Sequence, residues 1–269
     1  MNNKKTYGLS LTENSKTGPA FSLARAFTCI NKTPTCEAAC YGNGFRYQSS
    51  GQRSKRNQNY QTVEFLLSAG GIEALAENLV DIIDKAKPFN WVAAKFIQAQ
   101  ATWTLRIHDV GDFHSSDYVK AWTLALSLRP YCQAWFYTRS FLSTEIFQSL
   151  TELASLPNCK GFISIDKDNH QAAIDAYLSK PSVWNLAILQ DEAEHLPPEM
   201  IRKFQEHGIS ANAICFPKHR AGRHVAPVDL AGLTICPQVL GALPLESNPQ
   251  ELKPCQICRF CLPASVAMR

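Results

Sequence analysis

Apolar runs and polar loops alternate regularly through the chain after residue 100. Short apolar runs predict buried strands, and stretches with an apolar residue every three or four positions predict helices. The predicted strands cover residues 102–108, 134–139, 161–165, 183–189, 211–216 and 233–235, and the predicted helices cover residues 59–85, 117–128, 143–156, 170–178 and 198–207. Strands that alternate with helices pair in parallel through right-handed crossovers, so the pattern predicts an α/β fold.

The first 60 residues show little periodicity and are rich in Gly, Ser, Asn, Thr and Arg. A short strand is predicted over residues 7–11, and the rest is predicted to form a long loop, which is usually a functional feature. We expect residues 1–235 to form one α/β unit that includes this loop, and residues 236–269 to form a cysteine-rich segment.

Polar side chains follow the predicted strands at their carboxyl ends. His108, Asp109 and Asp112 follow one strand, and residues 137–140 end the next. βα barrels build their sites on this rim, whereas open α/β sheets use mainly the edge near one switch point. Polar side chains after several strands favour a partial parallel (β/α)6-type barrel.

The composition narrows the class of protein. The chain has 269 residues, 45% of them apolar, and no run of 18 apolar residues that could span a membrane. Its first residues lack the apolar stretch of a signal peptide, so we expect a cytoplasmic protein whose thiols stay reduced. The net charge of +4 allows a nucleic-acid partner without requiring one, and basic residues cluster at 46–56 and 218–224.

Ten cysteines in a reducing compartment predict metal ligands rather than disulfides. Cys132 and Cys159 precede strands and Cys215 lies inside one, which favours core packing for these three. The other seven fall into two groups near the ends of the chain: Cys29, Cys36 and Cys40, and Cys236, Cys255, Cys258 and Cys261.

The C-terminal group holds three cysteines at two-residue intervals, Cys255, Cys258 and Cys261, and Cys236 precedes them. Bacterial ferredoxin loops use the same triplet spacing to hold a 4Fe–4S cluster, whereas structural zinc usually binds two separated pairs. The spacing therefore predicts a closed 4Fe–4S centre, with zinc or no metal as alternatives.

The N-terminal group, Cys29, Cys36 and Cys40, has only three cysteines. A 4Fe–4S cluster held by three thiolates leaves one iron free for water, a substrate or a cofactor, and an open coordination position is what a catalytic metal needs. We expect chemistry at this group, with a zinc site completed by another ligand, or no metal, as alternatives.

A compact polar segment follows the predicted strand at 102–108. Its members are His108, Asp109, Asp112 and His114. Gly111 allows a tight turn that aims Asp112, and such residues can build a divalent metal site for hydrolysis, although a core position is the commoner fate of a histidine such as His108. Arg139, at the end of the next strand, can bind a carboxylate or phosphate, or can pair with an aspartate of this segment.

The order of these parts resembles radical SAM enzymes, which carry a three-cysteine cluster loop after the first strand of a partial βα barrel. The resemblance rests on the cysteine loop, on Tyr41 beside Cys40, and on Gly111 and Asp112, which stand where that family has a motif that holds the methionine amino group. The spacing C-x6-C-x3-C differs from the usual C-x3-C-x2-C of that family. The resemblance implies S-adenosylmethionine as a cofactor and an electron donor as a partner.

A second resemblance covers more of the chain. It rests on Cys36-x3-Cys40-Tyr41, on the run Arg-Ile-His-Asp-Val-Gly-Asp-Phe that ends at Phe113, on Tyr118-x3-Trp122, and on the run Phe-Tyr-Thr-Arg that ends at Arg139. These motifs are similar to those of an uncharacterised family of phage and mobile-element proteins. The resemblance implies a mobile-element origin and the cysteine set, and no particular reaction.

Three functions follow from these patterns. The leading hypothesis is an iron–sulfur, radical-SAM-like enzyme with an open N-terminal cluster and a C-terminal auxiliary cluster. Asp112 and Arg139 are expected to orient a ligand beside Tyr41 and Gly111, with His108 as a further catalytic candidate. The alternatives are a nucleic-acid-binding protein with structural iron–sulfur or zinc centres, and a metal-dependent hydrolase that uses residues 108–114. The substrate can be a small molecule, a peptide or a nucleic acid.

Overall fold

Eight strands form one mostly parallel sheet in the computed structural model, which describes residues 8–86, 103–190, 198–217, 233–240, 242–243 and 253–263. The strands are β1 Leu11–Asn14, β2 Gly18–Phe21, β3 Trp103–Ile107, β4 Cys132–Thr138, β5 Cys159–Ile165, β6 Trp184–Gln190, β7 Ala213–Pro217 and β8 Thr234–Ile235. They lie side by side in sequence order. β1 and β2 form an antiparallel hairpin, and every later pair is parallel. Among the described strands β8 does not pair with β1, so the sheet is open.

Helices connect most of the parallel strands. They are α1 Arg25–Thr28, α2 Pro34–Ala39, α3 Phe45–Gln48, α4 Ser50–Lys85, α6 Ser116–Ser127, α7 Thr144–Ala154, α8 His170–Ser179, α9 Pro198–Glu206 and α10 Pro254–Cys258, with short 3-10 helices at Tyr41–Asn43, Ser140–Leu142 and Ile209–Asn212. α4 consists of two helices joined at Gly71, where φ is 71°. None of the described helices is both long and apolar enough to cross a membrane.

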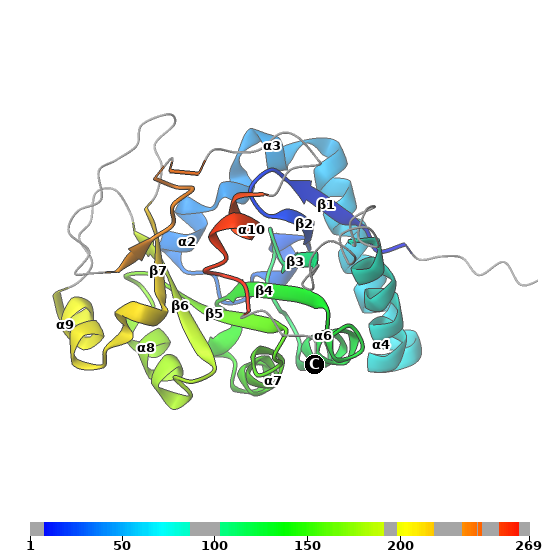
Figure 1. Cartoon of the computed structure of the whole chain (residues 1–269). Coiled ribbons are helices and arrows are strands. Elements are labelled where there is room, and N and C mark those ends of the chain that lie inside the picture. The colour runs from blue at the N-terminus through cyan, green and yellow to red at the C-terminus, as the bar shows by residue number, and fades with distance from the viewer. Residues whose placement is uncertain are drawn as a thin grey trace, which may run out of the picture.

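The sequential strand order decides where the helices lie. Because each right-handed crossover moves one strand further in the same direction, the connecting helices stack on one face of the sheet. Figure 1 shows α4, α6, α7 and α8 outside the curved sheet and α10 on its opposite, inner face. The sheet therefore has a helix-covered outer face and an inner face that the C-terminal segment covers.

Strand residues alternate between these two faces. Phe136, Ile163 and Leu186 point outward into the large core shared with the helices. Their neighbours Trp135 and Phe162 point inward, into a second core shared with the C-terminal segment: Ala187, Ile214, Cys236, Cys261 and Leu262 complete it.

Hydrogen bonds hold the C-terminal segment to the inner face. Gln256 of α10 donates to the Thr104 hydroxyl at 3.0 Å, and Arg259 donates to Gln133 at 2.9 Å. Both acceptors lie in the first half of their strands. α10 is thus anchored towards the amino end of the sheet, opposite the rim where the strands end.

The structure confirms the α/β class and the six strands predicted after residue 100, with ends shifted by one or two residues. Cys132, Cys159 and Cys215 are buried, as predicted. The expectation of a long loop over most of the first 60 residues is wrong. This region forms the β1–β2 hairpin, three short helices and the start of α4. The strand predicted at 7–11 begins only at Leu11, and residue 7 lies outside the described residues.

Candidate functional site

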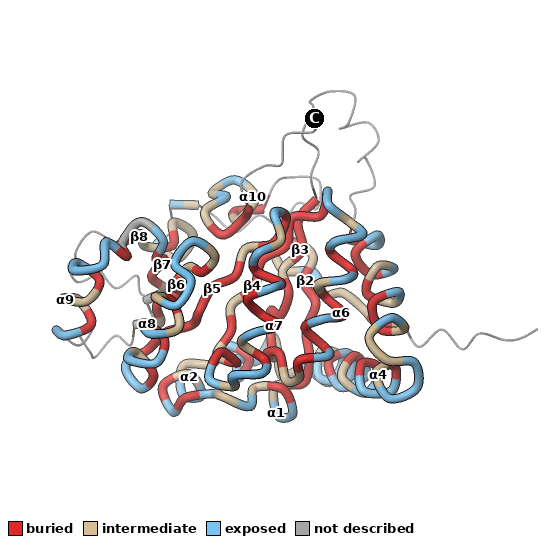
Figure 2. The backbone as a smooth tube through the Cα atoms, turned by 90° about the horizontal axis from the view of Figure 1, so that it is seen from below, coloured by how far each residue is buried: buried red, intermediate tan, exposed pale blue. Residues whose placement is uncertain are grey.

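Short helices hold the N-terminal cysteines beyond the carboxyl ends of the strands. Cys29 follows α1, Cys36 lies within α2, and Cys40 caps the end of α2. α2 begins after Thr33, whose Oγ1 accepts a hydrogen bond from the Cys36 N–H at 3.0 Å, and Pro34 occupies its first position. Figure 2 shows α1 and α2 at the end of the sheet opposite α10.

The three thiols are close enough to act on one another. Burial raises the pKa of Cys29 to about 12, with further contributions from the charges of Asp112, Cys36 and Cys40. Burial also raises the pKa of Cys36, whereas the Arg139 guanidinium lowers it. The N-terminal group therefore gathers three partly desolvated thiols, a carboxylate and a cation.

Gly111 brings the loop after β3 against the N-terminal segment. Its φ is 97°, a left-handed conformation that favours glycine. A Cβ at this position would lie 2.9 Å from the Leu23 carbonyl oxygen and 3.0 Å from the Thr28 Oγ1. This close approach leaves room only for glycine, and it places Asp112 near Cys29.

Asp112 is held by three donors. Its carboxylate accepts a hydrogen bond from the Thr138 hydroxyl at 2.7 Å and from the backbone N–H groups of Phe113 and Arg139, each at 2.8 Å. Burial raises the pKa of Asp112, and these bonds lower it. A carboxylate has roughly four acceptor positions, so Asp112 ties the ends of β3 and β4 together and keeps about one position for a ligand.

Arg139 pairs with Asp166 rather than with Asp109 or Asp112. Its guanidinium donates to Asp166 at 2.9 Å, and its buried Nε has no partner among the described residues. Asp166 also accepts a hydrogen bond from the Thr33 hydroxyl at 2.6 Å. The end of β5 therefore fixes both Arg139 and the start of α2.

The C-terminal cysteines come together on the inner face of the sheet. Cys236 follows β8, Cys255 and Cys258 lie in α10, and Cys261 follows α10. Burial raises the pKa of Cys255 to about 11 and that of Cys261 to about 12, and the charges of the neighbouring cysteines raise both. The fold thus brings Cys236 to a triplet that is about 20 residues away in the sequence.

Contacts through three side chains connect the two cysteine groups. Tyr41, next to Cys40, accepts a hydrogen bond from Arg106 at 2.8 Å. The Arg106 guanidinium lies 5.1 Å from the centre of the Tyr137 ring. The Tyr137 hydroxyl donates to the Cys261 Sγ at 2.9 Å. Tyr41 therefore lies at one end of this connection.

The polar side chains after β3 do not converge on one site. His108 lies in the outer aromatic core, where its Nε2 forms a hydrogen bond with the Tyr118 hydroxyl at 2.8 Å and burial lowers its pKa. Asp109 forms an ion pair with Arg106 at 3.2 Å, and His114 contacts a glutamate of α4. The divalent metal site expected for a hydrolase is not assembled by these residues.

The candidate cysteines do not form a preassembled site for a single metal ion. Among the described residues, which include all seven candidate cysteines, no three His, Cys, Asp or Glu side chains form a group that could hold a metal ion. Neither cysteine group, as the described residues place it, is therefore an assembled site for a single metal ion.

Three residues that hold the site in place, Thr33, Asp166 and Arg106, are not evident from the sequence. The Thr-Pro pair at 33–34 is a recognisable helix start, and Asp166 follows a predicted strand. No local pattern, however, pairs residues that are 133 positions apart. Arg106 begins the Arg-Ile-His-Asp-Val-Gly-Asp-Phe motif. The motif alone does not show which face of the sheet the Arg106 side chain is on, because that depends on the strand register.

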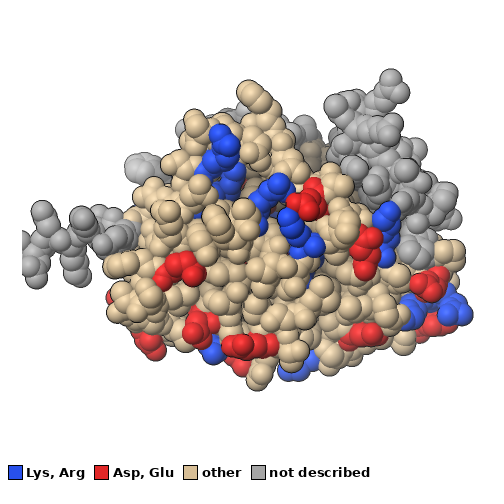
Figure 3. Space-filling model, turned by 180° about the vertical axis from the view of Figure 1, so that it is seen from behind, with Lys and Arg blue, Asp and Glu red and all other residues tan. Residues whose placement is uncertain are grey.

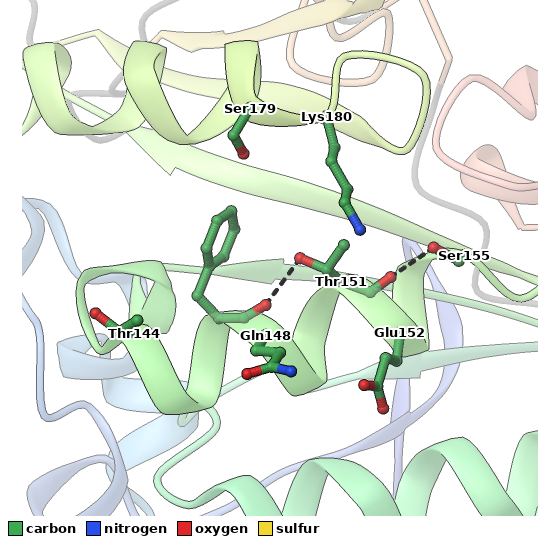
Figure 4. Close-up of a pocket in the computed structure, with 8 residues that line it drawn as sticks. Thr144, Gln148, Thr151, Glu152, Ser155, Ser179 and Lys180 are labelled. Carbon is green, nitrogen blue, oxygen red and sulfur yellow. Dashed lines mark hydrogen bonds between the residues drawn. The ribbon is translucent and has the colours of Figure 1, made fainter.

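A shallow hollow lies on the outer layer, between α7 and α8 (Figure 4). Three of its hydroxyl groups already donate to carbonyl oxygens within the helices: Thr151 to Phe147 at 2.8 Å, Ser155 to Thr151 at 2.7 Å and Ser179 to Ala176 at 2.7 Å. It contains none of the candidate site residues and therefore adds nothing to the site.

Basic side chains gather on the face that carries α1 and α2, around its middle and upper part (Figure 3). Burial lowers the pKa of Arg56, and the charges of Arg25 and Arg53 lower it further, so these three lie near one another. Phe45, in α3, is 96% exposed. The second basic cluster, at 218–224, lies outside the described residues.

Comparison with known proteins identifies a family. No curated protein and no solved structure matches the chain. The family model described as Gene product 88 matches residues 1–264, which is nearly the whole length. This match agrees with the phage-type family that the cysteine, histidine and Tyr-Thr-Arg motifs indicated. The chain belongs to the Gene product 88 family.

Proposed function

We propose that the protein is an iron–sulfur protein with an open 4Fe–4S centre at the N-terminal group and a closed one at the C-terminal group. One observation carries the proposal. The fold gathers seven of the ten cysteines into two groups at opposite ends of the sheet, while the other three pack in the outer core.

The spacing of the C-terminal cysteines along the sequence favours a cluster over zinc. Cys255, Cys258 and Cys261 form a C-x2-C-x2-C triplet, which is the spacing that bacterial ferredoxin loops use to hold a 4Fe–4S cluster. Structural zinc usually binds two separated pairs of cysteines.

The N-terminal group also has the means to hold a small ligand. Three cysteines leave one iron open, Arg139 has a buried Nε without a described partner, and Asp112 keeps about one acceptor position. A cation and an acceptor suit a ligand with a carboxylate and an amino group. In this proposal the sheet acts as a partial barrel and the open centre as a radical-SAM-like site for S-adenosylmethionine. Cys29, Cys36 and Cys40 would hold the cluster, which would supply single electrons there.

Variants that remove one group at a time test the proposal. After anaerobic reconstitution with iron and sulfide, Cys29→Ala/Cys40→Ala and Cys255→Ala/Cys258→Ala should each lose about half of the bound iron. Cys215→Ala, in the outer core, is the matched control and should keep all of it. Equal iron in all three variants, or none in the wild type, would contradict the proposal.

The ligand assignment has its own test. S-adenosylmethionine should change the electron paramagnetic resonance spectrum of the reduced wild-type protein and of the Cys255→Ala/Cys258→Ala variant, but not that of Cys29→Ala/Cys40→Ala. No spectral change in a protein that carries both centres would remove S-adenosylmethionine and leave the iron–sulfur proposal standing.

The basic face supports a second candidate function, binding of single-stranded nucleic acid. Arg25 and Arg53 form no ion pair with a described residue, and the exposed ring of Phe45 can stack on a base. A gel-shift assay with a single-stranded oligonucleotide should show affinity that falls steeply with salt. Arg53→Ala should weaken it and the distant Arg202→Ala should not; no binding at low salt would exclude this function.

A further inference from the structure

Two lysines border the C-terminal cysteine group without a described carboxylate partner. The Lys16 Nζ lies 5.3 Å from the centre of the Phe216 ring. The Lys160 Nζ lies 5.1 Å from the centre of the Phe260 ring and donates to the Phe260 carbonyl oxygen at 2.6 Å. Neither lysine forms an ion pair with a described residue.

Both lysines lie against the segment that carries the thiols. The Lys16 carbonyl oxygen accepts a hydrogen bond from the Cys255 N–H at 3.1 Å. Lys160 donates to the carbonyl oxygen of Phe260, the residue before Cys261, and the Phe216 and Phe260 rings pack against the core that contains Cys236 and Cys261. Arg106 lies nearby, beside the Tyr137 ring, and of these three cations only Arg106 has a described carboxylate partner, Asp109.

Cations without a carboxylate partner beside an apolar core are costly while the thiols are neutral, because the desolvation of their charge is only partly compensated. The balance reverses when the thiols are ionised. Four thiolates around a 4Fe–4S core or a zinc ion carry a net negative charge, which nearby cations stabilise. The surroundings of this group therefore match an anionic centre better than a set of free thiols.

We infer that Lys16 and Lys160 are the counter-charges of an anionic centre at Cys236, Cys255, Cys258 and Cys261. The inference rests on the proposed function in requiring metal at this group, but it holds for a cluster or for zinc. The lysines are positioning residues: they act on the thiolates and do not ligate. Groups of this kind commonly change metal affinity by 10–100-fold.

The gain in melting temperature on metal loading measures this role. It is obtained for the full chain with and without reconstitution by iron and sulfide, and in parallel with zinc alone. Lys16→Met removes a charge that makes no described hydrogen bond, and Lys160→Met tests the second site. Lys120→Met, at an exposed ion pair on α6, is the control.

For Lys16→Met and Lys160→Met we expect a smaller rise in melting temperature on metal loading and roughly 10-fold weaker zinc binding. We also expect a lower midpoint potential of the reconstituted centre. Lys120→Met should behave like the wild type. If a lysine variant lowers the melting temperature of the metal-loaded protein and that of the metal-free protein by the same amount, then the lysine has only a structural role. That result would overturn the inference. A wild-type protein that loads no metal at this group overturns the proposed function and the inference together.

Discussion

Gly111 is the residue on which the geometry of the N-terminal group depends most directly. Gly111→Ala forces a Cβ to within 2.9 Å of the Leu23 carbonyl oxygen at a φ of 97°, so we expect a loss of more than about 2 kcal/mol in the free energy of unfolding. Urea unfolding measures it. The control is Gly51→Ala in α4, where nothing lies within 4 Å, and a gain of about 0.5–1 kcal/mol is expected. Similar effects at both sites would refute the steric account.

His108 couples stability to pH. Its φ is 63° and it is buried, and burial holds its pKa well below 6.5. The unfolded chain therefore takes up a proton below pH 6.5 that the folded chain excludes, so this contribution to stability is present above pH 6.5 and is lost as the pH falls below it.

His108→Asn tests this coupling, because asparagine tolerates the left-handed backbone and does not titrate. The variant should be less stable at every pH, since it empties part of the aromatic core. Its melting temperature should nevertheless fall less between pH 7.5 and pH 5 than that of the wild type. An unchanged fall would mean that other groups carry the pH dependence.

At the scale of the element, α2 connects the N-terminal cysteine group to the sheet. Thr33 caps α2 through the Cys36 N–H and donates to the buried Asp166. Thr33→Val loses both bonds, so we expect a loss of about 2 kcal/mol in stability and less iron at the N-terminal group alone.

The matched control for Thr33→Val is Ser115→Ala, which removes the cap of α6, a helix without cysteines. It should lower the melting temperature by a comparable amount and leave the iron content unchanged. If both variants lose the same iron, then global stability, and not the position of α2, controls loading.

The elements after residue 100 could be predicted because each segment has a clear pattern of apolar and polar residues. The four helices and six strands predicted after residue 100 all match described elements, and the helix predicted at 59–85 falls within α4. The short helices at 25–48 could not be predicted, since they have no apolar face of their own: Thr33, Asp166 and neighbouring loop contacts hold them in place. The seven candidate cysteines and their division into two groups could be predicted from spacing, whereas the partners of Arg139 and His108 depend on strand register.

At the scale of the whole molecule, the sequential strand order leaves room for the two cysteine groups at different ends of the sheet. The helices leave the inner face free, the C-terminal segment fills it from the amino end, and α1 and α2 cover the rim at the carboxyl ends (Figures 1 and 2). Contacts between residues 253–263 and strands more than 90 positions earlier have no signature in a local pattern. The Tyr41, Arg106 and Tyr137 contacts then link the two groups through the sheet.

Iron, acid-labile sulfide and zinc analysis of anaerobically reconstituted wild-type protein tests the central claim most directly. Two 4Fe–4S centres predict about eight irons and eight sulfides per chain and a broad visible absorption that bleaches on reduction. Stoichiometric zinc without sulfide and without visible absorption would contradict it.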